Sequence, residues 1–182
     1  MRALSWLFLL FIAGCQTNSH PLSSKEKAAN ESLAKAAYKL KKETSLRPFG
    51  TSAQMMHQIE MLGLAFQYRD PIDLEKGRKL LVLAVNTLVE TVNATPDIHQ
   101  YLSHDPFLPQ NARVTIFIQN THGQEPEFGK LSIIRAKRGN LEYDIRDLES
   151  PCHLKTIFTE TYEEAVQRLK SQESLPLRSI IE

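Results

Sequence analysis

The stretch RVTIFIQNTHGQEPEFGKLSIIRAKRGNLEYDIR, residues 113–146, decides the fold class. Apolar and polar side chains alternate in it with a period of two, which is typical of half-buried β-strands, over residues 113–119, 131–136 and 141–146. Residues 120–130 link the first two strands. The link between the second and third strands, KRGN at 137–140, is a tight-turn sequence in which Gly139 or Asn140 can adopt a positive φ. Both links are short enough to favour antiparallel pairing of the three strands.

A long amphipathic helix is predicted before these strands, over residues 70–94. Asp70-Pro71 provides an N-cap carboxylate followed by a residue whose φ is fixed. Apolar side chains then repeat at helical spacing from Leu74 to Val92, and Pro96 follows. We therefore expect this helix to be the central packing element.

Two other segments have helical composition or spacing. In residues 158–172, Thr161 and Glu164 have the spacing of a capping box. Residues 24–43 are rich in strong helix formers and contain six Lys against three Glu. Two interpretations of this basic helix stay open. In the first, the helix rests on anionic headgroups. In the second, it is a solvated spacer, because its apolar face is mostly alanine.

Residues 58–69 have two competing periodicities. Met55, Ile59 and Leu62 fall at helical intervals, whereas Leu62, Leu64, Phe66 and Tyr68 alternate with more polar or smaller residues. The aromatic end favours a strand.

These elements predict a single α+β domain. It has an antiparallel sheet of three or four strands packed against two main helices, 70–94 and 158–172, and is preceded by an N-terminal helix. The predicted organisation is a signal peptide, a lipidated tether, a basic helix with a linker, the α+β domain and a tail, over residues 1–14, 15–23, 24–50, 51–174 and 175–182 respectively.

The first residues of the chain form an export signal. Arg2 precedes the apolar stretch from Leu4 to Ile12, which is too short for a transmembrane helix of roughly 20 residues. Ile12-Ala13-Gly14-Cys15 follows, and this sequence resembles the lipobox of bacterial lipoproteins. The resemblance implies acylation of Cys15, cleavage just before it, and a lipid bilayer as the first partner.

The resemblance also implies a location in the cell envelope. Gln16 follows the lipidated cysteine instead of the Asp that retains many lipoproteins in the inner membrane, which implies the outer membrane in a Gram-negative host. Loss of Arg2 from the 22 basic residues leaves their number equal to the 21 acidic ones. A neutral exported domain has no overall basic field, so we expect no nucleic acid as partner.

Candidate catalytic residues are few and match no complete pattern. If Cys15 carries lipid, Cys152 has no disulfide partner in the chain, and the adjacent His153 is a candidate base for its thiol. His99, His104 and Asp105 lie in the segment 97–111, which contains the densest set of reactive side chains. They cap and pack a loop in one interpretation, and form a surface for a partner or ligand in the other.

No metal or cofactor is expected. His99 and His104 are five residues apart, which places them off a common helical face, and neither a His-Glu-x-x-His nor a paired cysteine motif occurs. Two functions remain. The first is a membrane-anchored envelope lipoprotein with a non-catalytic domain that binds an envelope protein. The second is a small envelope hydrolase whose site is assembled by folding from His99, His104 and Asp105, or from Cys152 and His153.

Overall fold

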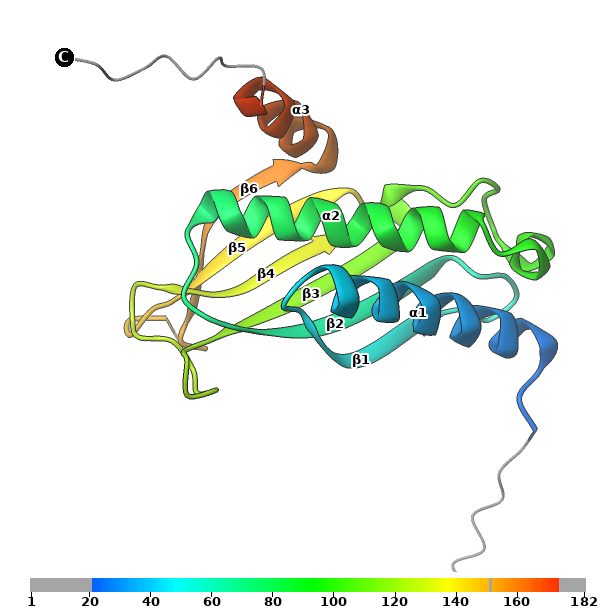
Figure 1. Ribbon diagram of the computed structural model, residues 1–182, viewed down its shortest axis with the longest axis horizontal. Helices are drawn as coiled ribbons and strands as arrows, with labels where there is room; N and C mark the ends of the chain where they lie inside the picture. Colours follow the sequence, from blue (N-terminus) through cyan, green and yellow to red (C-terminus); the bar gives the residue numbers. More distant parts are fainter. Residues whose placement is uncertain (1–20, 151, 174–182) are drawn as a thin grey trace, which may run out of the picture.

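The computed structural model describes residues 21–150 and 152–173. The predicted signal peptide, Cys15 and the predicted tail at 175–182 lie outside the described residues. The elements are α1 (Ser24–Glu43), β1 (Arg47–Gln54), β2 (Met61–Arg69), α2 (Leu74–Asn93), η1 (Pro96–Tyr101), η2 (Pro109–Asn111), β3 (Ala112–Gln119), β4 (Leu131–Lys137), β5 (Asn140–Arg146), β6 (Leu154–Thr161) and α3 (Tyr162–Glu173) (Figure 1). Within these ranges no helix has the length and apolar content that a bilayer span requires.

The strands form one sheet in chain order, β1-β2-β3-β4-β5-β6. All neighbours are antiparallel except β2 and β3, which run parallel and are joined through α2. A parallel pair needs such a crossover, because a tight turn cannot return the chain to the same end of the sheet. Helices α1 and α2 lie side by side on one face of the sheet, and α3 lies beyond β6 (Figure 1).

The predicted sheet of three or four antiparallel strands on two helices is wrong. The sheet has six strands with one parallel pair, and the fold has three main helices. The missed strands, β1 and β6, are the two edges of the sheet. All eight residues of β1 are exposed, and β6 buries one residue. Edge strands with so little to bury have no clear apolar alternation, so the pattern did not reveal them.

Two helix starts differ from the prediction. The N-cap of α2 is Asp73, whose carboxylate accepts a hydrogen bond of 2.7 Å from the Lys76 amide, and not Asp70. The predicted capping box of α3 is confirmed, since the Thr161 amide donates to the Glu164 carboxylate at 2.8 Å and the Glu164 amide donates to the Thr161 hydroxyl at 3.2 Å. The helix therefore begins after Thr161, and Phe158 belongs to β6. The strand predicted over 58–69 is confirmed as β2.

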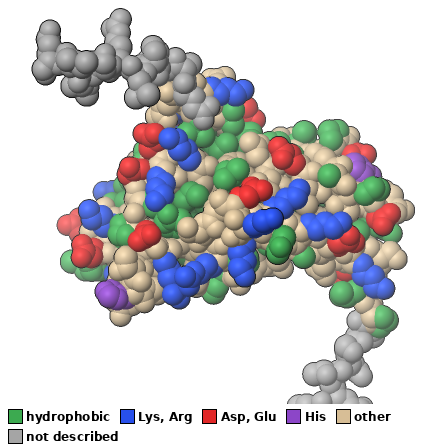
Figure 2. Space-filling view, in the orientation of Figure 1, with side chains coloured by type: hydrophobic (Ala, Val, Ile, Leu, Met, Phe, Trp, Pro, Cys, Tyr) green, Lys and Arg blue, Asp and Glu red, His purple; other side chains and the backbone are tan. Residues whose placement is uncertain are grey.

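Helix α1 packs its small-residue face into the core. Its buried side chains are Ala28, Ala29, Ser32, Leu33, Ala36 and Leu40, and the main contacts of α1 are with α2. At its first turn, Lys25 Nζ donates to the carbonyls of Met55, Met56 and His57 at 2.9, 2.7 and 3.2 Å. These bonds fix the start of α1 to the turn between β1 and β2. The basic side chains of α1, all of them Lys, lie on its outer surface (Figure 2).

The β4–β5 turn contains a strained residue. Arg138 and Gly139 have φ of 53° and 77°, so the turn is of the two-residue type that favours Asn-Gly. The prediction that Gly139 or Asn140 adopts a positive φ is met by Gly139, and the other positive φ of the turn falls on Arg138. A left-handed conformation costs a residue with a Cβ about 1–2 kcal/mol, and Asn tolerates it better than Arg.

Arg138→Asn is therefore expected to raise the free energy of unfolding by about 0.5–1 kcal/mol. Urea denaturation followed by circular dichroism measures this change. Lys130→Asn, which changes an exposed cation outside this turn, is the matched control and is expected to have no effect beyond about 0.5 kcal/mol. A stability of Arg138→Asn at or below that of the wild type would contradict the assignment of strain.

Candidate functional site

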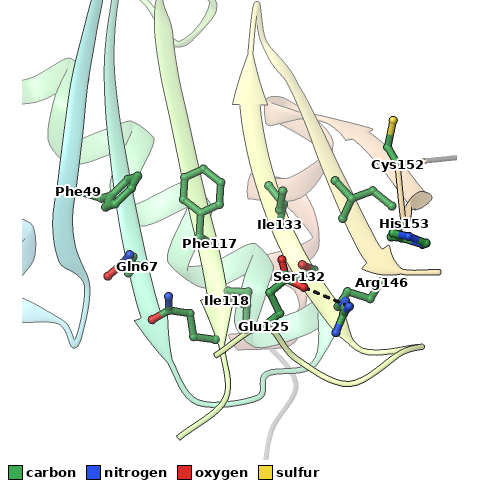
Figure 3. Close-up of a pocket in the computed structure, with 12 residues that line it drawn as sticks. Phe49, Gln67, Phe117, Ile118, Glu125, Ser132, Ile133, Arg146, Cys152 and His153 are labelled. Atoms are coloured by element: carbon green, nitrogen blue, oxygen red, sulfur yellow. Dashed lines mark ion pairs between the residues drawn. The ribbon is translucent and has the colours of Figure 1, made fainter. Parts of the chain in front are cut away.

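The sheet face opposite α1 and α2 contains a groove. Its volume is about 400 Å³, within the size range of small-molecule sites. The groove lies over β1 to β5, reaches the start of β6 and extends to the loops at the ends of β3 and β5 (Figure 3). It is lined by Phe49, Gln67, Phe117, Ile118, Gln119, Glu125, Ser132, Ile133, Arg146, Cys152, His153 and Leu154.

Three apolar side chains line the groove on the open face. Phe49, Phe117 and Ile133 come from β1, β3 and β4, and Figure 3 shows them side by side across the sheet. The rings of Phe49 and Phe117 meet edge to face, with centroids 5.7 Å apart. The register of β1 shifts between Pro48 and Gly50, and Phe49, at this irregularity, is 62% exposed. An exposed aromatic patch of this kind is typical of a binding surface.

Arg146 fixes the loop that closes one end of the groove. Its guanidinium donates to the Pro126 carbonyl at 2.9 Å and forms an ion pair with Glu125 at 3.1 Å. It also lies over the Phe128 ring, 4.3 Å from the centroid. These three contacts reach across the β3–β4 loop, so the wall of the groove is held in place without a ligand.

The polar lining of the groove has unused hydrogen-bonding capacity. Gln67, Gln119 and Ser132 contribute side chains that can donate and accept hydrogen bonds. Among the described residues, the Gln119 Oε1 atom is buried and has no hydrogen-bond partner. Leaving such an atom unpaired costs about 1–3 kcal/mol. A ligand that donates a hydrogen bond there would remove this cost.

Cys152 and His153 line the groove but do not form a nucleophile–base pair. Cys152 is exposed as a free cysteine, and its thiol points away from the His153 ring in Figure 3. The His153 ring instead meets the Phe128 ring edge to face, with centroids 6.3 Å apart. His153 has a φ of 53° in the short loop before β6. This geometry provides no base for the thiol.

His99 and Asp105 are in contact, and the contacts of His99 hold the 97–111 segment against the end of α2. His99 Nδ1 lies 2.8 Å from the Asp105 carboxylate, and Nε2 lies 3.1 Å from the Asn93 carbonyl. Both ring nitrogens therefore face acceptors, and neither is left to take a proton from a substrate. The Asp105 carboxylate, and then the Asn93 carbonyl, raise the pKa of His99 above its ordinary value. His104 is exposed, and its Nδ1 lies 3.2 Å from the Ser103 hydroxyl.

The candidate catalytic residues thus fall into two groups at opposite ends of the sheet. His99, His104 and Asp105 precede the start of β3, whereas Cys152 and His153 precede the start of β6. Because β3 and β6 run in opposite directions, these starts are separated by the length of a strand, about 25 Å. In the described part of the chain, no three His, Cys, Asp or Glu side chains are placed to hold a metal ion.

The raised pKa of His99 makes stability depend on pH. A protonated His99 is favoured in the folded state, so its contribution is fully present below the unfolded pKa of about 6.5 and is lost as pH rises through the higher folded pKa. We expect the difference in melting temperature between the wild type and His99→Gln to be largest near pH 5.5 and to shrink at alkaline pH. Thermal melts from pH 5.5 to 9 test this, with His57→Gln as control. A difference independent of pH would contradict the ion pair.

The sequence analysis named Cys152 and His153 but missed the other residues that line the groove. Phe117 and Ile133 were assigned to alternating strands, but they stand on the face that these strands turn away from the helices. An aromatic and a branched aliphatic side chain on that face were the available indication of a binding surface. The contribution of Phe49 could not be recognised, since β1 itself was not predicted.

The fold and the groove define a domain whose sheet is covered by α1 and α2 on one face and has a groove on the other. Searches for similar proteins found no family model, no curated protein and no solved structure that matches this chain.

Proposed function

We propose that this chain is a lipid-anchored protein of the bacterial cell envelope whose open sheet face binds a protein partner without chemical turnover. Cys15 would hold it to the bilayer, in the outer membrane of a Gram-negative host. The observation that supports binding most directly is the groove with Phe49 exposed, Phe117 half-buried against it and its loop wall fixed by Arg146. Aromatic and Arg side chains dominate the energetics of protein interfaces, which favours a protein as partner.

The groove, and not the 97–111 segment, is the better candidate for the interface. The 97–111 segment uses its polar groups internally. Asn93 donates to the Phe107 carbonyl at 2.9 Å and accepts from the Phe107 amide at 2.8 Å, while His99 is held by Asp105. In the groove, by contrast, the Phe49 ring is exposed and the buried Gln119 Oε1 has no hydrogen-bond partner among the described residues.

In-cell cross-linking tests both parts of the proposal. A photoreactive amino acid is introduced at Gln67 in the groove, or at Lys39 on the outer surface of α1 as the matched control. We expect one dominant adduct from position 67 in the wild type and none from position 39. Cys15→Ala should abolish the adduct if anchoring brings the two proteins together. Mass spectrometry identifies the partner and whether the protein carries lipid.

The outcomes separate the anchor from the partner. An adduct at position 67 that disappears in Phe117→Ala, with an unchanged melting temperature, supports binding in the groove. Equal adducts at both positions, or none at either, would contradict it. A protein that stays in the membrane fraction after Cys15→Ala would contradict anchoring through lipid.

The hydrolase interpretation stays a prediction with its own test. Simultaneous alanine substitution of His99, His104, Asp105, Cys152 and His153 should leave the cell phenotype unchanged if the domain only binds. Turnover of a cell-wall or lipid substrate by the purified protein, lost in this variant, would favour the hydrolase instead.

A further inference from the structure

A row of side chains crosses the open face of the sheet at the end where β1 finishes and β3 begins. Strand register places one residue from each strand in this row: Ser52, Gly63, Arg113, Lys137, Asn140 and Thr161. The groove lies farther along the same face, on other residues of these strands. None of the six is acidic, so the row is positively charged.

Arg113 and Lys137 stand directly opposite each other in the antiparallel pair β3–β4. Side chains in that position have Cβ atoms about 4.5–5.5 Å apart, and two like charges there destabilise the sheet. Neither side chain forms an ion pair with any described residue. The fold therefore holds two cations together without a counterion.

The acidic side chains nearest in the pattern are already engaged. Arg135, two residues before Lys137, forms ion pairs with Glu142 at 3.0 Å and with Asp144 at 2.7 Å. Asp144 also accepts a hydrogen bond of 2.7 Å from the Thr156 hydroxyl. These carboxylates consequently neutralise Arg135 and leave the charge of Arg113 and Lys137 uncompensated.

Arg113 also has an unused donor inside the sheet surface. Its Nε atom is buried and has no hydrogen-bond partner among the described residues. Beside it, Gly63 has no side chain, and a Cβ at that position would lie 2.3 Å from the Ser52 hydroxyl oxygen and 3.1 Å from the Arg113 Cβ. Because Gly63 has no side chain, the Ser52 hydroxyl can occupy the space above β2, toward the side on which Arg113 lies.

We propose that Ser52, Arg113 and Lys137 form a binding site for a phosphate-type oxyanion. A guanidinium, an ammonium and a hydroxyl supply charge-assisted and neutral donors of the kind that phosphate oxygens accept. The anion would relieve the repulsion between Arg113 and Lys137. A phosphate is favoured over an acidic peptide because Ser52, Arg113 and Lys137 lie in one row across the sheet instead of following a strand. The site requires neither the lipid anchor nor a partner in the groove.

Calorimetric titration of the full chain in a neutral detergent tests the site, with inorganic pyrophosphate as the probe. We expect saturable binding at low salt that weakens at least tenfold in Arg113→Gln and in Lys137→Gln. Lys39→Gln, on α1, and Arg69→Gln, elsewhere on the open face, are the matched controls and should bind as the wild type does. Without ligand, Arg113→Gln and Lys137→Gln should melt no lower than the wild type, since each removes a repulsive pair.

Two further titrants identify the source of the phosphate. Glycerophosphoglycerol is a soluble phosphodiester with the headgroup of an anionic lipid, and glycerol 3-phosphate is a phosphomonoester. Tighter binding of the first supports a lipid headgroup, and tighter binding of the second supports a free phosphorylated metabolite or polymer end. No saturable binding of any phosphate, an equal loss of binding in the control variants, or binding of a tetraglutamate peptide alone would overturn the proposal.

Discussion

Glu160→Ala is expected to lower the free energy of unfolding by about 3–5 kcal/mol, because it strips a buried cation of its counterion. The Glu160 side chain is 1% exposed and pairs with Arg78 Nε at 2.6 Å, and Arg78 itself is 7% exposed. The same carboxylate oxygen accepts a hydrogen bond of 2.7 Å from the Tyr143 hydroxyl. Burial, followed by the adjacent Glu160 carboxylate, raises the pKa of Tyr143, so the phenol stays a neutral donor.

Controls for this prediction separate the buried pair from its exposed neighbour. Arg168 Nε approaches the other Glu160 oxygen at 3.2 Å but is 55% exposed, so Arg168→Ala should cost no more than about 1 kcal/mol. The double variant Arg78→Met with Glu160→Leu removes both charges and should recover most of the loss. Urea denaturation of the four proteins measures these differences. If Glu160→Ala costs as little as Arg168→Ala, the pair does not stabilise the fold.

This cluster shows why the sequence could not predict the packing of α3. Glu160 and Arg78 are far apart in the chain, and the ion pair exists only because β6 lies beside β5 and α2 lies over the sheet. Phe158 adds to it, with the guanidinium of Arg78 and that of Arg168 both within 6 Å of its ring. Phe158 and Tyr162 are four residues apart, which is a helical spacing, but tertiary contacts place Phe158 in β6.

The elements that the sequence predicted well are those with one face fully buried. β3 to β5 and α2 bury a regular set of side chains, and the alternation or helical repeat that this produces is a local property. The position of β2 next to β3 is a global property, because α2 has to cross over before the two strands can pair in parallel. No local pattern distinguishes this arrangement from an antiparallel one.

The candidate site was less predictable than the fold. Pairing of His99 with Asp105 follows from proximity in the chain, but the contact of His99 with the Asn93 carbonyl depends on how α2 ends. The row of six residues that contains the proposed oxyanion site depends on the register of all six strands, and two of these strands have no clear sequence pattern. Nothing in the sequence around Gly63 and Ser52 indicates a binding site, because only the strand register brings these two residues near Arg113.

Leu33→Ala is expected to lower the free energy of unfolding by about 2–5 kcal/mol, which would establish α1 as part of the folded core. The Leu33 side chain is 2% exposed, and Ala29 and Ala36, one turn away on either side, are fully buried. Small neighbours bring α1 close to its supporting elements, so the space left by three missing heavy atoms cannot be refilled by a flexible side chain. Tyr38→Ala, on the same helix but 68% exposed, is the matched control and should change stability by less than about 0.5 kcal/mol.

The comparison of these two variants decides between the interpretations that composition left open for residues 24–43. A solvated spacer, or a helix resting on headgroups through its lysines, would make Leu33→Ala as harmless as Tyr38→Ala in detergent solution. A large loss confined to Leu33→Ala means that the alanine-rich face is a packing surface. Together with the bonds from Lys25 to the β1–β2 turn, it would also mean that the proposed lipid anchor joins the domain through a rigid helix. The open face would then keep a fixed orientation relative to the point where the tether begins.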